Sequence, residues 1–341
     1  MSITIKDVAK KAGVSCATVS LALRPDTPIA EKTRQKVLRI VNETGYRPSY
    51  KAQALKGSLT NTICFLFNKP FFDVVGGSYM DIFNALNIES AAHNHRIFLN
   101  STGAVLPLKE AIPQTYGIGV DGLIVVSELT ADDREFLKNT DIPVILMNRD
   151  FQAASVSCIV FDDCDGATKA VEYLLSLGHE RIAFLGKNDR DSSRRRLQGY
   201  MAGLENAGIS LDSDLIFGCD YETDSGKKAG EYILNLKNKP TAILCATDIL
   251  AVVLLEFFRQ KNVNVPGDVS VVGIDNSYVS NVGFPKLTTI DLSHNIMEMA
   301  KETLELMIKM AKYKEAGQKR IIPVELLVRE STAPYKKSMC K

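Results

Sequence analysis

The sequence predicts a small all-α head followed by an α/β body of two subdomains with mainly parallel sheets. Three short helix patterns occupy the first 57 residues. From about residue 61 onward, short apolar runs alternate with amphipathic stretches, which is the pattern of strands and helices in parallel sheets covered on both faces. This second part has about 280 residues, more than one hydrophobic core usually holds, so we expect it to form two α/β units.

The head contains two short helices joined by a tight turn, followed by a third helix. Thr4 and Asp7 have the spacing of a capping pair, and Gly13 supplies a left-handed stop for the first helix. Ser15 caps the second helix, and a third is expected from about Ala30 to Thr44. The apolar residues that form their shared core are Val8, Ala9, Ala12, Val14, Val19 and Leu23. Two helices packed across a three-residue turn are typical of a helix-turn-helix, whose second helix fits the major groove of DNA.

The charge of the chain is divided unevenly between these two parts. Residues 1–57 contain eleven Lys or Arg and four Asp or Glu, a net charge of +7, whereas the remainder carries 30 basic and 36 acidic residues, a net charge of −6. A basic head on an acidic body is the asymmetry expected if the head meets phosphates and the body does not. The alternative is a solvated helical domain with no such partner.

Several motifs in the head occur together at the spacing of one known protein family. They are Asp7-Val8-Ala9, Gly13-Val14-Ser15, Ala17-Thr18-Val19-Ser20, Thr33-Arg34 and Gly45-Tyr46-Arg47-Pro48. In these motifs the head resembles the DNA-binding domain of the lactose repressor (LacI/GalR) family of bacterial transcription regulators. The resemblance implies a homodimer that reads a two-fold symmetric operator in double-stranded DNA, with one recognition helix in each major-groove half-site.

The same resemblance implies a role for individual residues of the head. Cys16, Ala17 and Leu21 would face base edges. Leu21 stands where the family often has an arginine that can contact guanine with two hydrogen bonds; since leucine cannot donate, we expect an apolar contact there, for example with a thymine methyl group. The expected phosphate contacts, which set register without reading sequence, are Ser15, Thr18, Ser20 and Tyr46, and Thr4 is a further expected DNA contact.

The segment from Pro48 to Gly57 consists of helix-forming residues between a proline and a glycine. It is too short to be helical alone in water, so it should order only on a partner. The resemblance implies a hinge helix whose Leu55 enters the minor groove and kinks the duplex, with Ala52 one turn earlier allowing close approach. A plain flexible linker is the alternative. We therefore expect a DNA-binding domain at residues 1–47, a hinge at 48–60 and an effector-binding and dimerisation domain at 61–341.

The body shows a regular order of strand and helix patterns. The expected strands are Thr62 to Phe67, Ile97 to Leu99, Gly122 to Val126, Val144 to Met147, Ile159 to Phe161, Ile182 to Gly186, Ala242 to Ala246 and Val269 to Ile274. The expected helices include Met80 to Ala92, Gly166 to Leu177, Arg196 to Ala207, Thr223 to Asn235 and Leu250 to Lys261. We expect the chain to cross between the two subdomains near residues 159–162, 289–292 and 320–324.

Polar residues follow several of these strands, where ligands of such sheets bind. They are Asn68 to Phe72, Asn148-Arg149, Asp162-Asp163, Asp248 and Asp275-Asn276. Carboxylates, an amide and aromatic rings suit a polyhydroxylated ligand, because paired hydroxyls take bidentate hydrogen bonds and the apolar face of a sugar rests on a ring. For Asp162 and Asp248, helix capping is the alternative. In the run Arg194-Arg195-Arg196, we assign Arg194 and Arg195 to a solvated face.

Motifs of the same family continue through the body. They are Pro70-Phe71-Phe72, Val120-Asp121-Gly122, 177–183, Arg196-Leu197-Gln198-Gly199-Tyr200, 247–251, Val265-Pro266, 272–276 and 285–289. Here the chain resembles the periplasmic-binding-protein type of effector domain. By that resemblance the effector contacts, strongest first, are Arg196 and Asp275, then Phe72, Phe161 and Asp248, then Asn148.

Other kinds of site are not indicated by the sequence. The four histidines include no pair at metal-ligand spacing, and the seven cysteines form no Cys-x-x-Cys pair; we expect no metal, no cofactor and a reducing cytosol. No apolar run is long enough for a membrane helix. No nucleophile elbow, phosphate loop or dinucleotide fingerprint is present.

Three kinds of function remain open. A ligand-responsive transcription regulator, expected to be a cytoplasmic repressor with a sugar-like effector, accounts for head, hinge and body together. A solute-binding protein of a sugar transport system accounts only for the body and requires an export signal. An α/β enzyme acting on a sugar requires a catalytic pair in the cleft, for which Asp162 and Asp275 could be nominated. The regulator explains most of the sequence, and its subunit contacts are expected on outer helices such as Met80 to Ala92.

Overall fold

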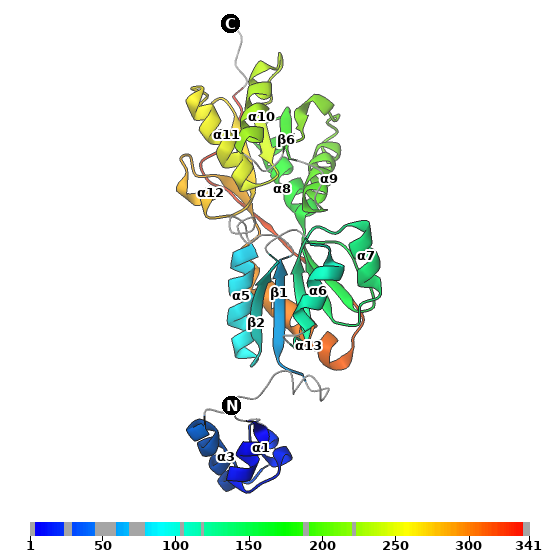
Figure 1. Cartoon of the computed structure of the whole chain (residues 1–341). Coiled ribbons are helices and arrows are strands. Elements are labelled where there is room, and N and C mark those ends of the chain that lie inside the picture. The colour runs from blue at the N-terminus through cyan, green and yellow to red at the C-terminus, as the bar shows by residue number, and fades with distance from the viewer. Residues whose placement is uncertain are drawn as a thin grey trace. The chain divides into compact units, whose positions relative to one another are not determined.

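The structure, a computed structural model, describes residues 4–23, 29–44, 59–67, 79–102, 106–116, 119–186, 191–219 and 223–336. The chain forms two compact units, one containing residues 1–60 and the other nearly all residues from 61 onward. The first is the helical head and the second is the α/β body (Figure 1). The predicted fold class is confirmed for both. No helix in the described ranges has the length and apolar character needed to span a membrane.

The head consists of α1 (Ile5–Ala12), α2 (Cys16–Ala22) and α3 (Glu31–Thr44). The amide and hydroxyl of Thr4 both donate to the Asp7 carboxylate, at 2.9 and 2.7 Å. Gly13, with a φ of 64°, ends α1 in the left-handed conformation that glycine adopts without steric cost. Ser15 Oγ accepts the Thr18 amide at 3.0 Å and so begins α2. The turn between the two helices is thus fixed at both ends by local bonds.

The core of the head is small and is shared by all three helices. Its buried residues are Val8, Ala9, Ala12, Val19, Ala22, Val37 and Ile40. A fully buried valine or isoleucine contributes about 1.5–3 kcal/mol relative to an exposed one. The Arg34 guanidinium on α3 adds a hydrogen bond to the Ala22 carbonyl at 3.0 Å, which ties the end of α2 to α3.

The body contains two six-stranded sheets, with strand orders β11-β5-β4-β3-β1-β2 and β12-β10-β9-β8-β6-β7. We call the parts built on them the first and second lobes. The first sheet contains β1 (Thr62–Phe67), β2 (Arg96–Ser101), β3 (Gly122–Val126), β4 (Val144–Met147), β5 (Val156–Phe161) and β11 (Lys319–Ile322). The second contains β6 (Ile182–Leu185), β7 (Ile216–Phe217), β8 (Ala242–Cys245), β9 (Ser270–Asp275), β10 (Thr288–Asp291) and β12 (Glu325–Leu327).

All strand pairs between these elements are parallel except β10 with β12. The chain passes from the first sheet to the second after β5, returns after β10, and passes again between β11 and β12. Three connecting segments therefore join the two lobes.

Helices cover the sheets on both faces (Figure 1). They are α5 (Tyr79–Ala92), α6 (Leu108–Tyr116), α7 (Ala131–Lys138), α8 (Asp163–Ser176), α9 (Asp191–Asn206), α10 (Thr223–Asn235), α11 (Asp248–Gln260), α12 (Val279–Val282) and α13 (Ile296–Tyr313), with a 3₁₀ turn at Ser213–Leu215. The strand residues of β1, β3, β4 and β5 are buried throughout, as expected for strands covered on both faces.

Three of the helices begin earlier than the sequence pattern predicts. We expect α8 from Gly166, α9 from Arg196 and α11 from Leu250, whereas they begin at Asp163, Asp191 and Asp248. The first turns of these helices are polar, so hydrophobic periodicity does not reveal them. As a result, residues expected in loops after strands lie in helical first turns.

Candidate functional site

The residues of α2 that are predicted to contact DNA differ in how exposed their side chains are. Ala17 and Leu21, one turn apart, are exposed, and the Leu21 side chain is 41% accessible. Cys16 is half-buried and packs against the core of the head, so the three predicted base-reading residues are not equally available. Ser15 is exposed and both Thr18 and Ser20 are partly so. Tyr46, Ala52 and Leu55 lie outside the described residues.

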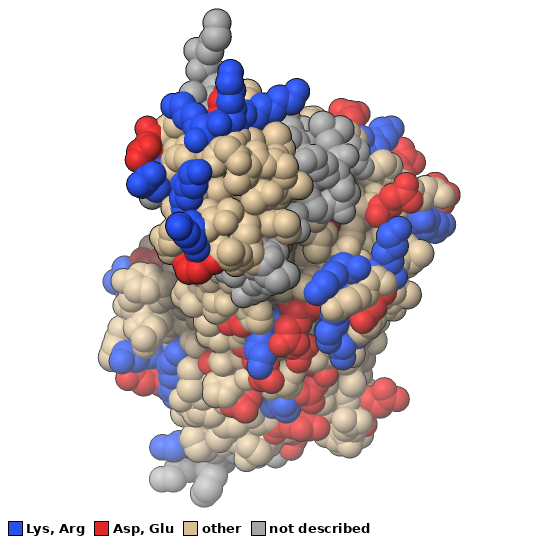
Figure 2. Space-filling model, turned by 90° about the horizontal axis from the view of Figure 1, so that it is seen from below, with Lys and Arg blue, Asp and Glu red and all other residues tan. Residues whose placement is uncertain are grey.

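The surface around this helix is basic. Figure 2 shows Lys and Arg side chains gathered on the head with few acidic side chains among them. The described cations of α1 and α3 are Lys6, Lys10, Lys11, Lys32, Arg34, Lys36 and Arg39. Such a surface attracts a polyanion, and its attraction is screened by salt because the charges are in water.

In the body, a chain of charged side chains lies where strands of both sheets end. The Arg196 guanidinium, whose side chain is 4% exposed, donates from Nε to Asp163 Oδ1 at 2.7 Å. Its Nη2 donates to Asp275 Oδ1 at 3.1 Å, and its Nη1 donates to the Ala246 carbonyl. The two predicted leading effector contacts are therefore adjacent. Asp163, expected only as one of the polar residues that follow strands, is fully buried and pairs with Arg196.

Arg195 also belongs to this chain, so its assignment to a solvated face is wrong. Its side chain is 16% exposed, and Nη2 donates to both Asn148 Oδ1 and Asp163 Oδ2, each at 2.6 Å. Arg194, in contrast, is half-exposed and pairs with Asp191 of its own helix. A run of three arginines looks uniform in sequence, but successive helical residues point in directions about 100° apart, so only part of the run faces solvent.

The close packing of α8 on α9 brings Asp163 to the two arginines. A Cβ atom at Gly199 of α9 would lie 2.0 Å from the Cys164 carbonyl oxygen of α8, so only glycine permits this approach. The Thr168 hydroxyl bonds to the Gly199 carbonyl at 3.1 Å. A larger side chain at residue 199 would force the helices apart and separate the Asp163 carboxylate from its partners.

The backbone after β9 is held in an unusual conformation. Asp275 and Asn276 have φ values of 131° and 50°, a region that non-glycine residues seldom adopt and that is often found at functional sites. The Arg329 guanidinium donates to Asn276 Oδ1 at 2.6 Å and to the Leu287 carbonyl at 2.9 Å. Arg329 lies near the end of the described chain, and nothing in the sequence pattern predicted its contact with the site. Asn148, after β4, also has a positive φ of 57°.

Asp162 and Asp248 differ in the role that their carboxylates play. Asp162 caps α8 by accepting the Asp165 amide at 3.1 Å, so the capping alternative holds for it. For Asp248 it is wrong, because Thr247 caps α11. The Asp248 carboxylate is instead fully buried and accepts from the Ser277 amide at 2.8 Å and the Thr289 hydroxyl at 2.6 Å. Both oxygens thus hold neighbouring segments.

Burial is the main cause of the raised pKa values of Asp275 and Asp248. The pKa of Asp275 is raised to about 7. Burial and the nearby Asp248 and Asp163 carboxylates raise it, and the Arg196 guanidinium lowers it. Burial also raises the pKa of Asp248, against the hydrogen bonds from Thr289 and Ser277, which lower it. Raised pKa values are frequent where a protein binds a ligand.

The first lobe contributes a second buried arginine, next to Asn148 in the sequence. The Arg149 guanidinium donates to Glu128 and, at 2.7 Å, to the Asn148 carbonyl. Despite burial, which lowers it, the pKa of Arg149 is raised by Tyr79, Glu128 and Asp191. Phe161 is 3% exposed within the apolar core, and Phe72 lies outside the described residues. The roles of all these side chains toward a ligand remain predictions.

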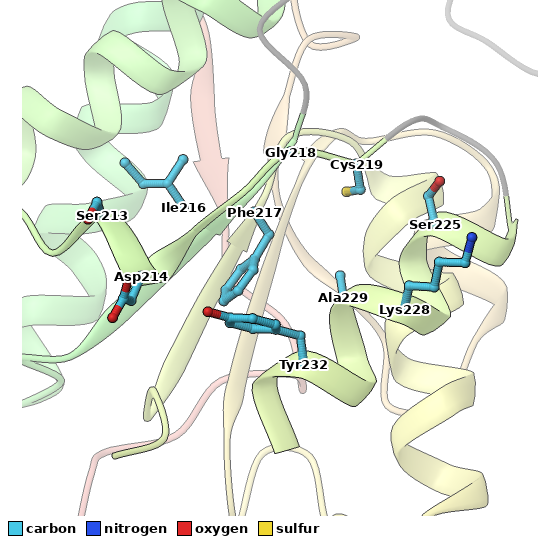
Figure 3. A pocket seen from close by; sticks show the side chains of 10 residues that line it. All are labelled: Ser213, Asp214, Ile216, Phe217, Gly218, Cys219, Ser225, Lys228, Ala229 and Tyr232. Carbon is cyan, nitrogen blue, oxygen red and sulfur yellow. The ribbon is translucent and has the colours of Figure 1, made fainter. Parts of the chain in front are cut away.

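A separate hollow of about 400 Å³ lies at the outer edge of the second sheet (Figure 3). It is formed by β7, the 3₁₀ turn and α10. The rings of Phe217 and Tyr232 meet edge to face there, with their centroids 4.9 Å apart, and Lys228 lies across from them. None of the predicted site residues lines it. Elsewhere, the described residues contain no group of three His, Cys, Asp or Glu that could hold a metal ion.

The chain matches known protein families in both of its parts. Residues 4–49 match the model described as bacterial regulatory proteins, lacI family, and residues 171–332 match a periplasmic binding protein-like domain. It is similar to the HTH-type transcriptional regulator DegA of Bacillus subtilis, with 32% identity over 98% of this chain and 99% of the relative.

Two solved structures are similar over almost the whole chain. The lac repressor dimer bound to operator and the anti-inducer ONPF shares 26% identity, with a TM-score of 0.80 over 98% of this chain and 100% of that chain. The complex of the transcriptional regulator CelR with cellobiose shares 25% identity, with a TM-score of 0.71 over 96% and 99%. These relatives are transcription regulators, which displaces the solute-binding and enzymatic alternatives. The chain belongs to the lacI family of bacterial transcription regulators, with a helix-turn-helix DNA-binding domain and a periplasmic-binding-protein-like ligand-binding domain.

Proposed function

We propose that this regulator is a cytoplasmic repressor that binds a two-fold symmetric operator as a homodimer and is controlled by a sugar-like effector in the cleft between its lobes. The proposal rests on the ion pairs of Arg196 with Asp163 and Asp275. These pairs hold a buried guanidinium in a fixed direction at the ends of strands of both sheets, where ligands of such folds bind. In the same chain, a capped helix exposes a face suited to a groove.

On the DNA side, Ala17 and Leu21 are the proposed base contacts, with Cys16 at the margin of the interface. Their side chains carry no hydrogen-bond donors for bases other than the thiol, which favours readout of thymine methyl groups. Ser15, Thr18 and Ser20, with Thr4, are proposed to contact phosphates, together with Tyr46. Ala52 and Leu55 are proposed to act in the minor groove.

On the effector side, Asp275 is the most available of the proposed contacts, since its side chain is 19% exposed and only one of its oxygens accepts from Arg196 in a described bond. Asn148 and Arg196 supply further polar groups, and Phe72 and Phe161 are the proposed apolar contacts. The buried Asp248 acts by holding Ser277 and Thr289. Carboxylate and amide groups suit vicinal hydroxyls, and the CelR relative contains cellobiose.

A homodimer is supported by exposed apolar side chains on the outer elements of the body. Tyr278, Val282 and Phe284 at and beside α12 are 82%, 58% and 91% exposed. Ile88 on α5 is also exposed, and Figure 1 draws α5 and α12 along the same side of the body. Exposed apolar groups of this size are typical of protein interfaces.

The test has two stages. Duplexes are first selected from a random pool with the full chain, and the mass of the complex is measured by sedimentation. We expect an inverted-repeat sequence and two chains per duplex. The double variant Tyr278→Asp with Phe284→Asp should bind as a monomer with weak affinity. Selection of no common sequence, or one chain per duplex at full affinity, would contradict the proposal.

The second stage identifies the effector. Sugars, sugar phosphates and nucleobases are screened for compounds that raise the melting temperature, and each such compound is tested for its effect on binding of the selected duplex. We expect at least one sugar derivative to act in both assays. A nucleobase acting in both would keep the regulator but refute the sugar assignment.

A further inference from the structure

The three consecutive arginines of α9 have different surroundings. Arg194 is half-exposed and pairs with Asp191 of the same helix. Arg196 is buried within the second lobe against Asp163, Asp275 and the Ala246 carbonyl. Arg195 lies between them and reaches the other lobe.

A single amino group of Arg195 bonds to both lobes. Nη2 carries two hydrogens, and it lies 2.6 Å from Asn148 Oδ1 and 2.6 Å from Asp163 Oδ2. Asn148 follows β4 of the first lobe, whereas Asp163 begins α8, which packs on α9 in the second lobe. Because the Asp163 carboxylate fixes the guanidinium, the bond to Asn148 joins one lobe to the other.

A second ion pair also crosses between the lobes but is weaker by its geometry. Arg134 on α7 lies 3.8 Å from Asp191 on α9, and its side chain is 34% exposed. A long, partly exposed pair is weakened by water and salt. The Arg195 contacts are short and largely shielded from solvent, so they contribute more to the position of the lobes.

The same contacts connect the lobes to the proposed effector site. Asp163 accepts Arg195 on one oxygen and Arg196 on the other, and Arg196 continues to Asp275. A ligand that forms hydrogen bonds with Asn148, Arg196 or Asp275 therefore weakens or strengthens the bonds that position Arg195.

We propose that Arg195 is a cross-lobe latch: held by Asp163, it bonds to Asn148 and stabilises one arrangement of the two lobes, and thereby sets how strongly the effector-free regulator binds its operator. This inference rests on the proposed effector-controlled function. It assigns a role to a residue that is not itself needed for contact with DNA. Because the arrangement of the lobes and DNA binding are thermodynamically linked, loss of the Arg195–Asn148 bond should change operator affinity.

The test compares effector-free full-length proteins on the selected duplex at one salt concentration. The variants are Arg195→Gln, Asn148→Ala, the double variant, and Arg194→Gln as the neighbouring control. We expect Arg195→Gln and Asn148→Ala to change operator affinity in the same direction by about fivefold or more. The double variant should equal Arg195→Gln alone, because Arg195→Gln already removes the bond to Asn148 together with the pair with Asp163. Arg194→Gln should stay within about twofold.

Hydrogen exchange on the same proteins gives a second readout that needs no DNA. Loss of the latch should speed exchange after β4 in the first lobe and in the first turn of α9 in the second, in both single variants. Arg195→Lys, which keeps the charge beside Asp163 but has no second branch, should give an intermediate result. Additive effects in the double variant, or faster exchange confined to one lobe, would overturn the latch. Failure of the wild-type protein to bind any selected duplex would overturn the proposed function, while the exchange result still decides whether the lobes are latched.

Discussion

The head and the body use charged and polar groups in opposite ways. In the described part of the head, the groups proposed to meet DNA are exposed or partly exposed, and the bonds that position them join residues three apart, as in Thr4 with Asp7 and Ser15 with Thr18. In the body, the central charges are buried and their bonds join residues 32 to 79 positions apart. The head therefore presents mainly exposed charge to a partner, whereas the body holds buried, paired charge that a ligand can rearrange. The first should respond to salt and the second should not.

Salt provides the largest expected difference between the two regions. Raising the salt concentration from about 50 to 200 mM should weaken binding of the selected operator by about a thousandfold, as for proteins that neutralise several phosphates. The melting temperature of the body should change little, because buried pairs are screened weakly. Fluorescence anisotropy and calorimetry measure the two effects. A loss of affinity below about tenfold would contradict the electrostatic role of the head.

Removal of a buried charge should be the next largest effect. Arg196→Ala leaves the Asp163 carboxylate buried with one of its two cations missing, which should lower the free energy of unfolding by about 3–5 kcal/mol. The matched control is Arg259→Ala, which removes an exposed pair with Glu256 on α11 and should cost about 1 kcal/mol or less. Urea unfolding measures both. Equal losses in the two variants would refute the contrast between buried and exposed pairs.

The cap of the recognition helix should contribute less. Ser15→Ala removes the acceptor of the Thr18 amide and should destabilise the head by about 1 kcal/mol. Ser15→Asp retains a capping oxygen but adds a negative charge, so it should preserve the stability of the head while weakening operator binding. Thermal unfolding followed with duplex titration separates the two functions. If Ser15→Asp binds the operator as the wild type does, Ser15 lies away from the phosphates.

The pH dependence of stability gives a further expected difference. The pKa of Asp275 is about 7 in the folded chain against an ordinary value of 3.8, so the folded state holds a proton between these values that the unfolded state has lost. This contribution to stability is present at low pH and disappears as the pH rises through 7. The Asp275→Asn variant has no titrating carboxyl group at this position and so lacks this contribution. The melting temperature of the wild type relative to this variant should therefore fall by a few degrees from pH 5 to pH 8; a constant or rising difference would contradict the raised pKa.

The same contrast explains what the sequence could predict. Capping pairs, the glycine stop and the apolar spacing of the head are local patterns, and the structure bears them out at Thr4, Gly13 and Ser15. The alternation of strands and helices likewise predicted two mainly parallel sheets. Local patterns determine local structure, so these features could be predicted.

The arrangement of the site could be predicted only in part. The sequence pointed to polar residues after strands, and the structure places one of them, Asp275, beside Arg196. The roles of Asp163, Arg195 and Arg329 depend on contacts over more than thirty residues, which no periodicity encodes. Asp248 was expected at a cleft surface, but its carboxylate is buried against β9. Gly273 of that strand approaches it so closely that a Cβ atom added at residue 273 would lie 2.3 Å from Asp248 Oδ1.

The central claim is that the cleft controls the head, and operator affinity with and without effector tests it most directly. The compound found by thermal shift is added to the wild type and to Asp275→Ala, and binding of the selected duplex is measured at fixed salt. We expect a change of about fivefold or more for the wild type and none for the variant, which should bind DNA normally alone. An unchanged response in Asp275→Ala, or no response in the wild type to a compound that binds it, would contradict the account.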